Sequence, residues 1–312
     1  MEKSIYKNNR KLFKRAKTAI KARYLHTFSP LKNFASFKIL AYHGIGNQLF
    51  QYAAVRAYSI KYDLPIILPD PNLHRLGNFN IKCKFVSQDD IDVVNKNIFN
   101  ESGFSFNQKF FDYRMRKYFI GYFQTEKYFL KYKNLIREEF TIKDRHINDY
   151  CYNYIKKIKN KIPGKQLISI HNRRGDNVPA ETDYVDNKKG IFLVDKQLYH
   201  PLLSMNYIKK AMLYFPNSVF LVFSNNEEDI KWCEKNILGS NVYFSKGHKD
   251  IIDFTLMRMC DHNIIANSTF SWWAAWLNEN PKKIVIAPKI WFGEKFSHVD
   301  LKDLIPESWI II

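Results

Sequence analysis

From residue 166 onward, short apolar runs alternate with amphipathic stretches, and this alternation constrains the fold more than any other feature of the sequence. Runs with strand character lie near residues 167–171, 219–223, 242–244, 263–266 and 284–287. Helical spacing of apolar residues recurs near 205–214, 227–237, 250–260 and 270–279. The pattern predicts an α/β fold whose parallel sheet is covered by helices. Ligands of such sheets bind beyond the carboxyl ends of the strands.

The first part of the chain holds a second strand, loop and helix unit. Residues 37–42 have strand character, the loop HGIGNQ follows, and apolar residues then recur at helical spacing from Leu49 to Ile60. Residues 75–160 show no clean period. A chain of 312 residues is long enough for two domains.

We place the domain boundary near Pro163-Gly164, in a short turn-forming sequence. This predicts a basic arm over residues 1–37, an N-terminal domain over 38–164 and a C-terminal domain over 165–312.

The formal net charge of +19 is concentrated at the N-terminus. Residues 1–38 contain eleven Lys or Arg and the single acid Glu2, and Leu12, Ala16, Ile20 and Tyr24 follow one another at four-residue spacing. A basic amphipathic helix of this kind suits an anionic membrane surface, and a solvated basic tail explains the charge equally well. Because no zinc finger, helix-turn-helix or RRM-like motif accompanies the arm, nucleic acid is not an expected partner.

No run reaches the ~20 apolar residues of a spanning helix, and no signal sequence opens the chain. We therefore expect a cytoplasmic protein. The four cysteines are scattered, without a CxxC pair or a Cys/His cluster, which predicts reduced thiols and no metal site.

The run LISIH at residues 167–171 leads directly into three charged residues, Arg173, Arg174 and Asp176. Two guanidiniums at the end of a buried strand require an anion, and phosphate suits their forked donors best. We expect His171 to form a hydrogen-bonding wall of the pocket and Asp176 to orient an arginine, because a carboxylate beside two guanidiniums has a lowered pKa and makes a poor base.

The loop after the first strand offers backbone and amide groups through Gly44, Gly46, Asn47 and Gln48. Glycine allows close approach, and the start of a helix favours anions. A dinucleotide fingerprint needs a third glycine where Leu49 stands, which argues against a nicotinamide oxidoreductase. A tight turn packed on a helix is the alternative for this loop.

Two further junctions carry polar residues after a strand. Asn225, between Ser224 and Asn226, could meet a base or ribose. Asn267 opens a turn whose hydroxyls and free N–H groups can cap a helix or hold a phosphate, and the residues expected there are Ser268, Thr269, Phe270 and Ser271. The tryptophans that follow are expected in the core: Trp272, Trp273 and Trp276.

These motifs together resemble glycosyltransferase family 11, which comprises mainly α-1,2-fucosyltransferases. The resemblance runs from about residue 38 to the C-terminus, through GIGNQLFQYA (44–53), HNRRGD (171–176), FSNNEEDIKWCEKN (223–236) and HNIIANSTFSWWAAWLNENPKKIVIAP (262–288). It implies a GT-B-like fold, with two Rossmann-like domains facing a cleft. The implied reaction is a metal-independent, cofactor-free, inverting transfer of L-fucose from GDP-β-L-fucose to the 2-hydroxyl of a galactose.

The resemblance also assigns roles to residues. It places Arg173 on the donor diphosphate, with His171, Arg174, the Gly46-Asn47-Gln48 loop and the serine-rich turn around the donor. Related fucosyltransferases carry an acid beyond the double arginine, which favours Glu181 over Asp183 as the base that accepts the acceptor proton.

Two departures from the family pattern keep alternatives open. His43 precedes Gly44, and Asn172 stands where an apolar residue is common, so another GDP-deoxyhexose such as colitose, or another linkage, fits the same motifs. The setting implied is bacterial surface-glycan (O-antigen) synthesis on a lipid-linked β-galactoside at the inner membrane, near which the arm (1–38) would hold the enzyme. A basic membrane- or nucleic-acid-binding module is the alternative from another functional class.

Overall fold

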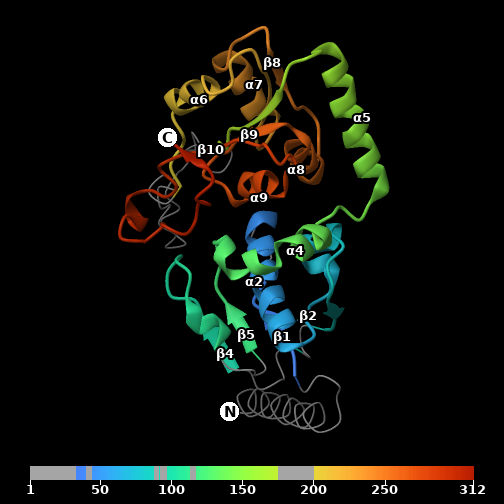
Figure 1. Ribbon diagram of the computed structural model, residues 1–312, viewed down its shortest axis with the longest axis vertical. Coiled ribbons are helices and arrows are strands. Elements are labelled where there is room, and N and C mark those ends of the chain that lie inside the picture. The colour runs from blue at the N-terminus through green and yellow to red at the C-terminus, as the bar shows by residue number, and fades with distance from the viewer. Residues whose placement is uncertain (1–32, 40–43, 88–90, 92–96, 113–116, 175–199) are drawn as a thin grey trace, which may run out of the picture. The chain divides into compact units, whose positions relative to one another are not determined.

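The computed structural model describes residues 33–39, 44–87, 91, 97–112, 117–174 and 200–312 (Figure 1). Contacts between Cα atoms divide the chain into two compact units, which are described separately below. The first consists of Met1–Gly44 and Gln48–Glu139, and the second of Ile45–Asn47 and Phe140–Ile312. The division falls before helix α5 (Arg145–Lys161) instead of at Pro163-Gly164, because α5 packs on helix α8 (Asp250–Met259). The arm up to residue 32 lies outside the described residues.

The first unit contains a three-stranded parallel sheet in the order β1-β5-β4. Its strands are β1 (Ala35–Phe37), β4 (Asn97–Asn100) and β5 (Lys117–Ile120). Between β1 and β4 along the chain, the strands β2 (Ile67–Leu68) and β3 (Lys84–Phe85) form a separate short parallel pair.

The strand predicted over 37–42 is shifted in the structure. The sheet strand ends at Phe37, and the carbonyl of Lys38 accepts a hydrogen bond from the Gln51 side chain at 3.1 Å. Residues 40–43 lie outside the described part of the chain. The prediction was therefore wrong about the start of the strand, because pairing with β5 begins at Ala35.

Among its described residues the first unit has helices α2 (Ile45–Tyr62), whose first three residues group with the second unit, and α4 (Lys133–Glu139). The predicted helix after the glycine loop is thus confirmed. Helix α2 buries Leu49, Ala53 and Ala57 completely. Short 3-10 turns cover Pro71–Leu73, Arg75–Asn78, Gln108–Phe111, Glu126–Tyr128 and Leu130–Tyr132.

The second unit is built on a six-stranded sheet in which every pair is parallel (Figure 1). Its strands are β6 (Leu167–His171), β7 (Val219–Phe223), β8 (Val242–Phe244), β9 (His262–Ile264), β10 (Val285–Ala287) and β11 (Ile310–Ile311). The spatial order β8-β7-β6-β9-β10-β11 is the 3-2-1-4-5-6 order of a Rossmann fold.

Helices connect these strands, as parallel pairing requires. They are α6 (Met205–Met212), α7 (Glu227–Asn236), α8 and α9 (Thr269–Leu277), and a 3-10 turn covers Glu294–Phe296. The helices and strands predicted from residue 166 onward are confirmed within a few residues, and so is the α/β class with a parallel sheet. The cleft of a GT-B arrangement stays a prediction.

The core of the second unit contains the predicted tryptophans. Trp272 and Trp273 are fully buried and Trp276 is 5% exposed, so all three are core residues. The cysteines are free thiols, and three of the four are buried, as expected: Cys151, Cys233 and Cys260.

Candidate functional site

The strand order of the second unit reverses between β6 and β9, which lie side by side in the sheet. From β6 the chain builds outward through β7 and β8, and from β9 it builds the other way through β10 and β11. A crevice outside the carboxyl ends of the strands at such a switch point is the usual ligand site of an open α/β sheet. The two segments at this point are 171–174 and 265–271, which are two of the predicted site segments.

Arg174, the second of the two adjacent arginines, is held by side chains of helix α7 and the segment before it. The Arg174 guanidinium carbon lies 3.6 Å from the centre of the Trp232 ring, and its Nε lies 3.7 Å from Oδ1 of Asp229. The backbone N–H of Arg174 donates to Oδ1 of Asn225 at 3.1 Å. Arg174 is thus held against helix α7. Arg173, at the same strand end, is half-buried like its neighbour.

His171 is a buried neutral imidazole. Burial, reinforced by the positive charge of Arg173, lowers its pKa to about 3. Its ring lies 5.7 Å from that of Phe270, and its Nδ1 has no hydrogen-bond partner among the described residues. The imidazole therefore forms a wall beside the start of α9, and its predicted hydrogen bond to a ligand stays a prediction.

The side chains after β7 are occupied in holding the arginine segment. The Ser224 hydroxyl donates to the carbonyl of Asn172 at 2.6 Å, and the Asn172 amide donates to Sγ of Cys233 at 3.3 Å. Asn226 caps α7 by accepting from the N–H of Asp229. Asn172 is 3% exposed, so this departure from the family pattern is buried against α7.

The start of α9 packs against the start of α2, within the second unit. The Thr269 hydroxyl donates to Oδ1 of Asn47 at 2.9 Å. A Cβ atom at Gly46 would lie 2.4 Å from the carbonyl carbon of Thr269 and 2.6 Å from the nitrogen of Phe270. Gly46 is therefore needed for contact between two helix starts. This contact agrees with the alternative of a turn packed on a helix, and the predicted approach of a ligand to the loop stays a prediction.

The remaining predicted residues of these two loops have varied surroundings. Gly44 is exposed and has space around it, whereas Gln48 is fully buried and accepts the N–H of Arg75 at 2.8 Å in the first unit. Ser268 is the N-cap of α9 without a side-chain cap bond, and the Ser271 hydroxyl donates to the carbonyl of Ser268. Of the two roles that the sequence left open for these hydroxyls, capping by the Ser268 side chain is not seen in this described turn, and phosphate binding stays a prediction.

A polar cluster at the carboxyl end of β8 was missed from the sequence. Ser245 donates to Oδ1 of Asp253 at 2.6 Å and lies 2.8 Å from Nδ1 of His248, whose Nε2 lies 2.8 Å from the Tyr150 hydroxyl. Burial raises the pKa of Asp253 against the opposing hydrogen bonds from Ser245 and His248. A serine directly after a strand, with acids at the start of the next helix, was the available signal.

The carboxyl edge of the first unit's sheet has its own polar support. Glu101, which follows β4, accepts the N–H groups of Tyr122 at 2.6 Å and Phe123 at 3.0 Å. The Gln51 amide donates to the carbonyl of Gly121 at 2.7 Å. Burial raises the pKa of Glu101 to about 7 in spite of the two N–H donors.

We expect the thermal stability of the protein to fall as the pH rises through about 7 because of Glu101. Its pKa in the folded state lies above the ordinary value of 4.5, so its contribution is complete below pH 4.5 and is lost as the carboxyl ionises. The substitution Glu101→Gln mimics the neutral form and should remove about 2–4 °C of the change in Tm between pH 5 and pH 8. Identical pH profiles for the variant and the natural protein would contradict this assignment.

Asp176, Glu181 and Asp183 lie outside the described residues, so their predicted roles stay predictions. Within the described segments, no group of three or more His, Cys, Asp or Glu residues could hold a metal ion. Across the same segments, no helix is both long enough and apolar enough to cross a bilayer.

Comparison with known proteins identifies the family. The profile of glycosyl transferase family 11 matches residues 7–312. An alpha-1,2-colitosyltransferase of Escherichia coli is 31% identical over 302 residues, covering 86% of this chain and 96% of that protein. The O-antigen biosynthesis glycosyltransferase WbnK of Escherichia coli is 32% identical over 199 residues, which cover 61% of this chain and 59% of WbnK.

Among solved structures, a NodZ alpha-1,6-fucosyltransferase soaked with GDP-fucose has a TM-score of 0.47 and 12% identity, and covers 81% of this chain and 95% of its own. The match of the family profile to nearly the whole chain is decisive. The chain belongs to glycosyltransferase family 11 and is a glycosyltransferase.

Proposed function

We propose that this enzyme transfers L-fucose from GDP-β-L-fucose, with inversion, to the 2-hydroxyl of a galactose in a bacterial surface polysaccharide. The observation that carries this proposal is the position of Arg173 at the switch point of a Rossmann-ordered sheet, two residues after the end of β6, which pairs with the strand that leads into α9. A guanidinium and the start of a helix are both suited to a diphosphate.

Arg173 stabilises the departing GDP in this proposal. As the bond from fucose C1 to the diphosphate breaks, negative charge grows on the phosphate oxygens, and a preorganised guanidinium with helix N-terminal amides stabilises that charge. His171 keeps no charge of its own, because its pKa is lowered to about 3. The donor diphosphate therefore meets the cation of Arg173 beside a neutral wall, and we propose that the reaction needs neither a metal ion nor a cofactor.

The acceptor hydroxyl loses its proton to a carboxylate in this mechanism. We propose Glu181 as that base, with Asp183 as the alternative and Asp176 as the residue that orients an arginine. Loss of kcat in Glu181→Gln, with binding of GDP unchanged, would support the assignment. An equal loss of GDP binding would place Glu181 in the donor pocket instead.

Colitose is a second candidate for the transferred sugar. The observation in its favour is the Escherichia coli alpha-1,2-colitosyltransferase, with which this chain aligns over 96% of that protein. Colitose lacks the 3-hydroxyl of fucose, and a pocket built to hydrogen-bond that hydroxyl would reject colitose by about 10⁴-fold or more.

A competition between the two donors decides the sugar. GDP-fucose and GDP-colitose are offered together with one β-galactoside, and the ratio of the two products gives the ratio of kcat/KM. We expect fucose to be transferred in excess. A product containing only colitose would show that GDP-colitose is the donor, and the proposed position of the donor site would stand.

We also propose that the enzyme works at the cytoplasmic face of the inner membrane, on a lipid-linked acceptor. The basic residues of the segment 1–38 would hold it near anionic headgroups, each contributing about 1 kcal/mol close to the surface. Flotation with anionic and neutral vesicles tests this, and equal partitioning with and without the segment would contradict it.

A further inference from the structure

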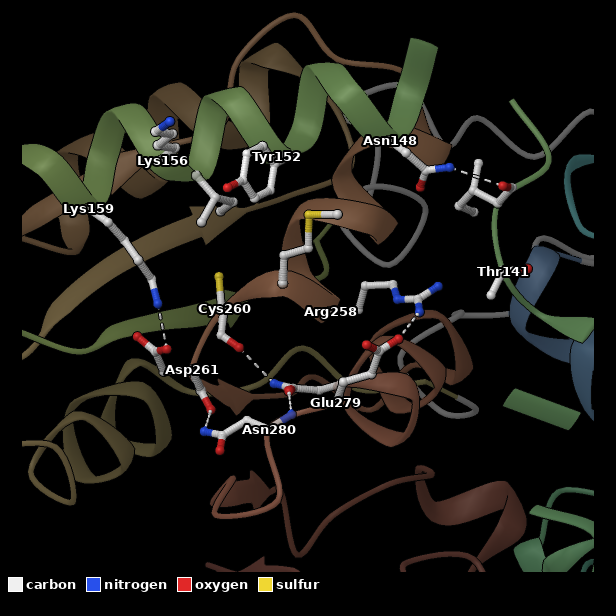
Figure 2. A pocket seen from close by; sticks show the side chains of 14 residues that line it. Thr141, Asn148, Tyr152, Lys156, Lys159, Arg258, Cys260, Asp261, Glu279 and Asn280 are labelled. Atoms are coloured by element: carbon white, nitrogen blue, oxygen red, sulfur yellow. Dashed lines mark hydrogen bonds and ion pairs between the residues drawn. The ribbon is translucent and has the colours of Figure 1, made fainter. Parts of the chain in front are cut away.

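A cavity of about 640 Å³ lies in the second unit, away from the site described above (Figure 2). Residues of α5, the end of α8 and the turn after α9 line it. One of them, Asp261, immediately precedes β9 and accepts the N–H of Leu167 at the start of β6. The cavity thus lies at the amino ends of the strands, whereas the switch-point segments follow their carboxyl ends.

A buried guanidinium reaches into the wall of this cavity. The Arg258 side chain is 11% exposed, and burial lowers its pKa. It donates to the carbonyl of Phe140 at 3.3 Å and to Glu279 at 2.9 Å, but the Glu279 side chain is 79% exposed (Figure 2). A guanidinium has five N–H donors, and a desolvated one is stabilised by an anion that also loses its water.

The other cations of the cavity leave it with net positive charge. Lys159 pairs with Asp261 at 2.6 Å, as Figure 2 shows. Lys156, one turn earlier on α5, has no ion-pair partner among the described residues. The rest of the lining is partly apolar, through Ile142, Ile155 and Met259. This combination suits an anionic group attached to an apolar chain.

The residues on the outer surface of α5 indicate that this ligand comes from a membrane. Tyr150 and Tyr152 are 45% and 61% exposed, and the lysines at 156, 157 and 161 are exposed beside them. Tyrosine suits a boundary between apolar and wet surroundings, and lysine stems extend over apolar surface while their ammonium groups meet anionic headgroups.

We propose that this cavity binds an anionic membrane phospholipid, whose phosphate lies near Arg258 and Lys156 and whose acyl chain lies along the apolar lining below Tyr152. The site docks the second unit on the bilayer independently of the basic arm. It does not depend on which sugar the enzyme transfers.

Vesicle flotation of the full chain tests the proposal with two matched charge reversals on one helix. Lys156→Glu alters the cavity, and Lys157→Glu makes the same change at an exposed neighbour outside it. Vesicles of phosphatidylcholine with phosphatidylglycerol are used at the lipid concentration that binds half of the natural protein. We expect both charge reversals to weaken binding, and Lys156→Glu to need roughly tenfold more lipid than Lys157→Glu because it also alters the cavity. Tyr152→Ser should also weaken binding, because it removes apolar surface at the cavity mouth.

Both variants keep the arm, and both lie outside the proposed catalytic machinery, so transfer to a soluble acceptor reports on their folding. If the two lysine variants needed equally more lipid, binding would depend on the general charge of the surface and the cavity site would be wrong. If neither variant needed more lipid, the basic arm would account for binding, and the site would be wrong as well. Release of the protein from vesicles by inorganic phosphate at constant ionic strength would assign the cavity to a soluble anion and overturn the lipid.

Discussion

Replacing Arg173 with alanine is expected to lower kcat/KM for sugar transfer by about 10²–10³-fold, which corresponds to the loss of one preorganised donor to a developing charge. Arg173 follows β6 at the switch point, and its neighbour Arg174 is held on α7 by Trp232 and Asp229. The effect should fall mainly on kcat, because the charge on GDP is larger in the transition state than in the bound donor. Initial rates of GDP release measure it.

Arg174→Ala is the matched control, since it removes the same charge one residue away. Arg174 lies over the Trp232 ring at 3.6 Å and near Asp229, so its loss should lower stability by about 1 kcal/mol. We expect a smaller loss of activity than in Arg173→Ala, through loosening of the segment. The account would be contradicted if Arg173→Ala stayed within about threefold of the natural enzyme while Arg174→Ala abolished transfer.

Gly46→Ala is expected to lower stability by about 1–3 kcal/mol and to abolish most of the activity. A Cβ atom at this position would lie 2.4 Å from the carbonyl carbon of Thr269, which is backbone and cannot rotate away. The start of α9 must therefore move, and Phe270 beside His171 moves with it. Thermal unfolding and initial rates of the purified variant measure the two effects.

Gly44→Ala is the matched control. It tests whether the loop needs glycine in general or only at Gly46, where the helix starts are in contact. Gly44 has φ of −60° and ψ of 159°, which alanine adopts freely, and nothing lies within 4 Å of its added Cβ. We expect stability within about 0.5 kcal/mol of the natural protein. Loss of activity without loss of stability at Gly44 would show that the donor itself approaches this residue. Equal stability of the Gly46 and Gly44 variants would contradict the packing argument.

The sheet of the second unit could be predicted from the sequence because most of its strands lie in apolar runs and because helices α6 to α9 alternate with strands β6 to β9 along the chain. Parallel strands covered on both faces need continuous apolar runs, and β6 and β7 are buried at every residue. The first unit was less predictable. Its β4, Asn97–Asn100, is mostly exposed and has an asparagine at each end, and it is held by pairing with β5, which no local pattern in the sequence records.

The sequence predicted which segments form the candidate site. It did not predict which of their side chains contact other parts of the protein. Arg173 and Arg174 are chemically identical in the sequence, and no local pattern records that Arg174 lies over Trp232 and near Asp229 of α7. Gly46 meets the Thr269-Phe270 peptide, more than 200 residues away in sequence, and its predicted approach to a ligand stays a prediction. Contacts of this range depend on tertiary structure and leave no local pattern.

Release of GDP from GDP-fucose in the presence of EDTA, with lactose as acceptor and Arg173→Ala alongside, tests the central proposal most directly. We predict release that rises with lactose, is insensitive to EDTA and falls by about 10²–10³-fold in the variant, with fucose linked to the 2-hydroxyl of galactose in the product. Acceptor-dependent release that is unchanged in Arg173→Ala would contradict the proposed site. Binding of GDP without transfer to any β-galactoside from either GDP-fucose or GDP-colitose would contradict the proposed reaction.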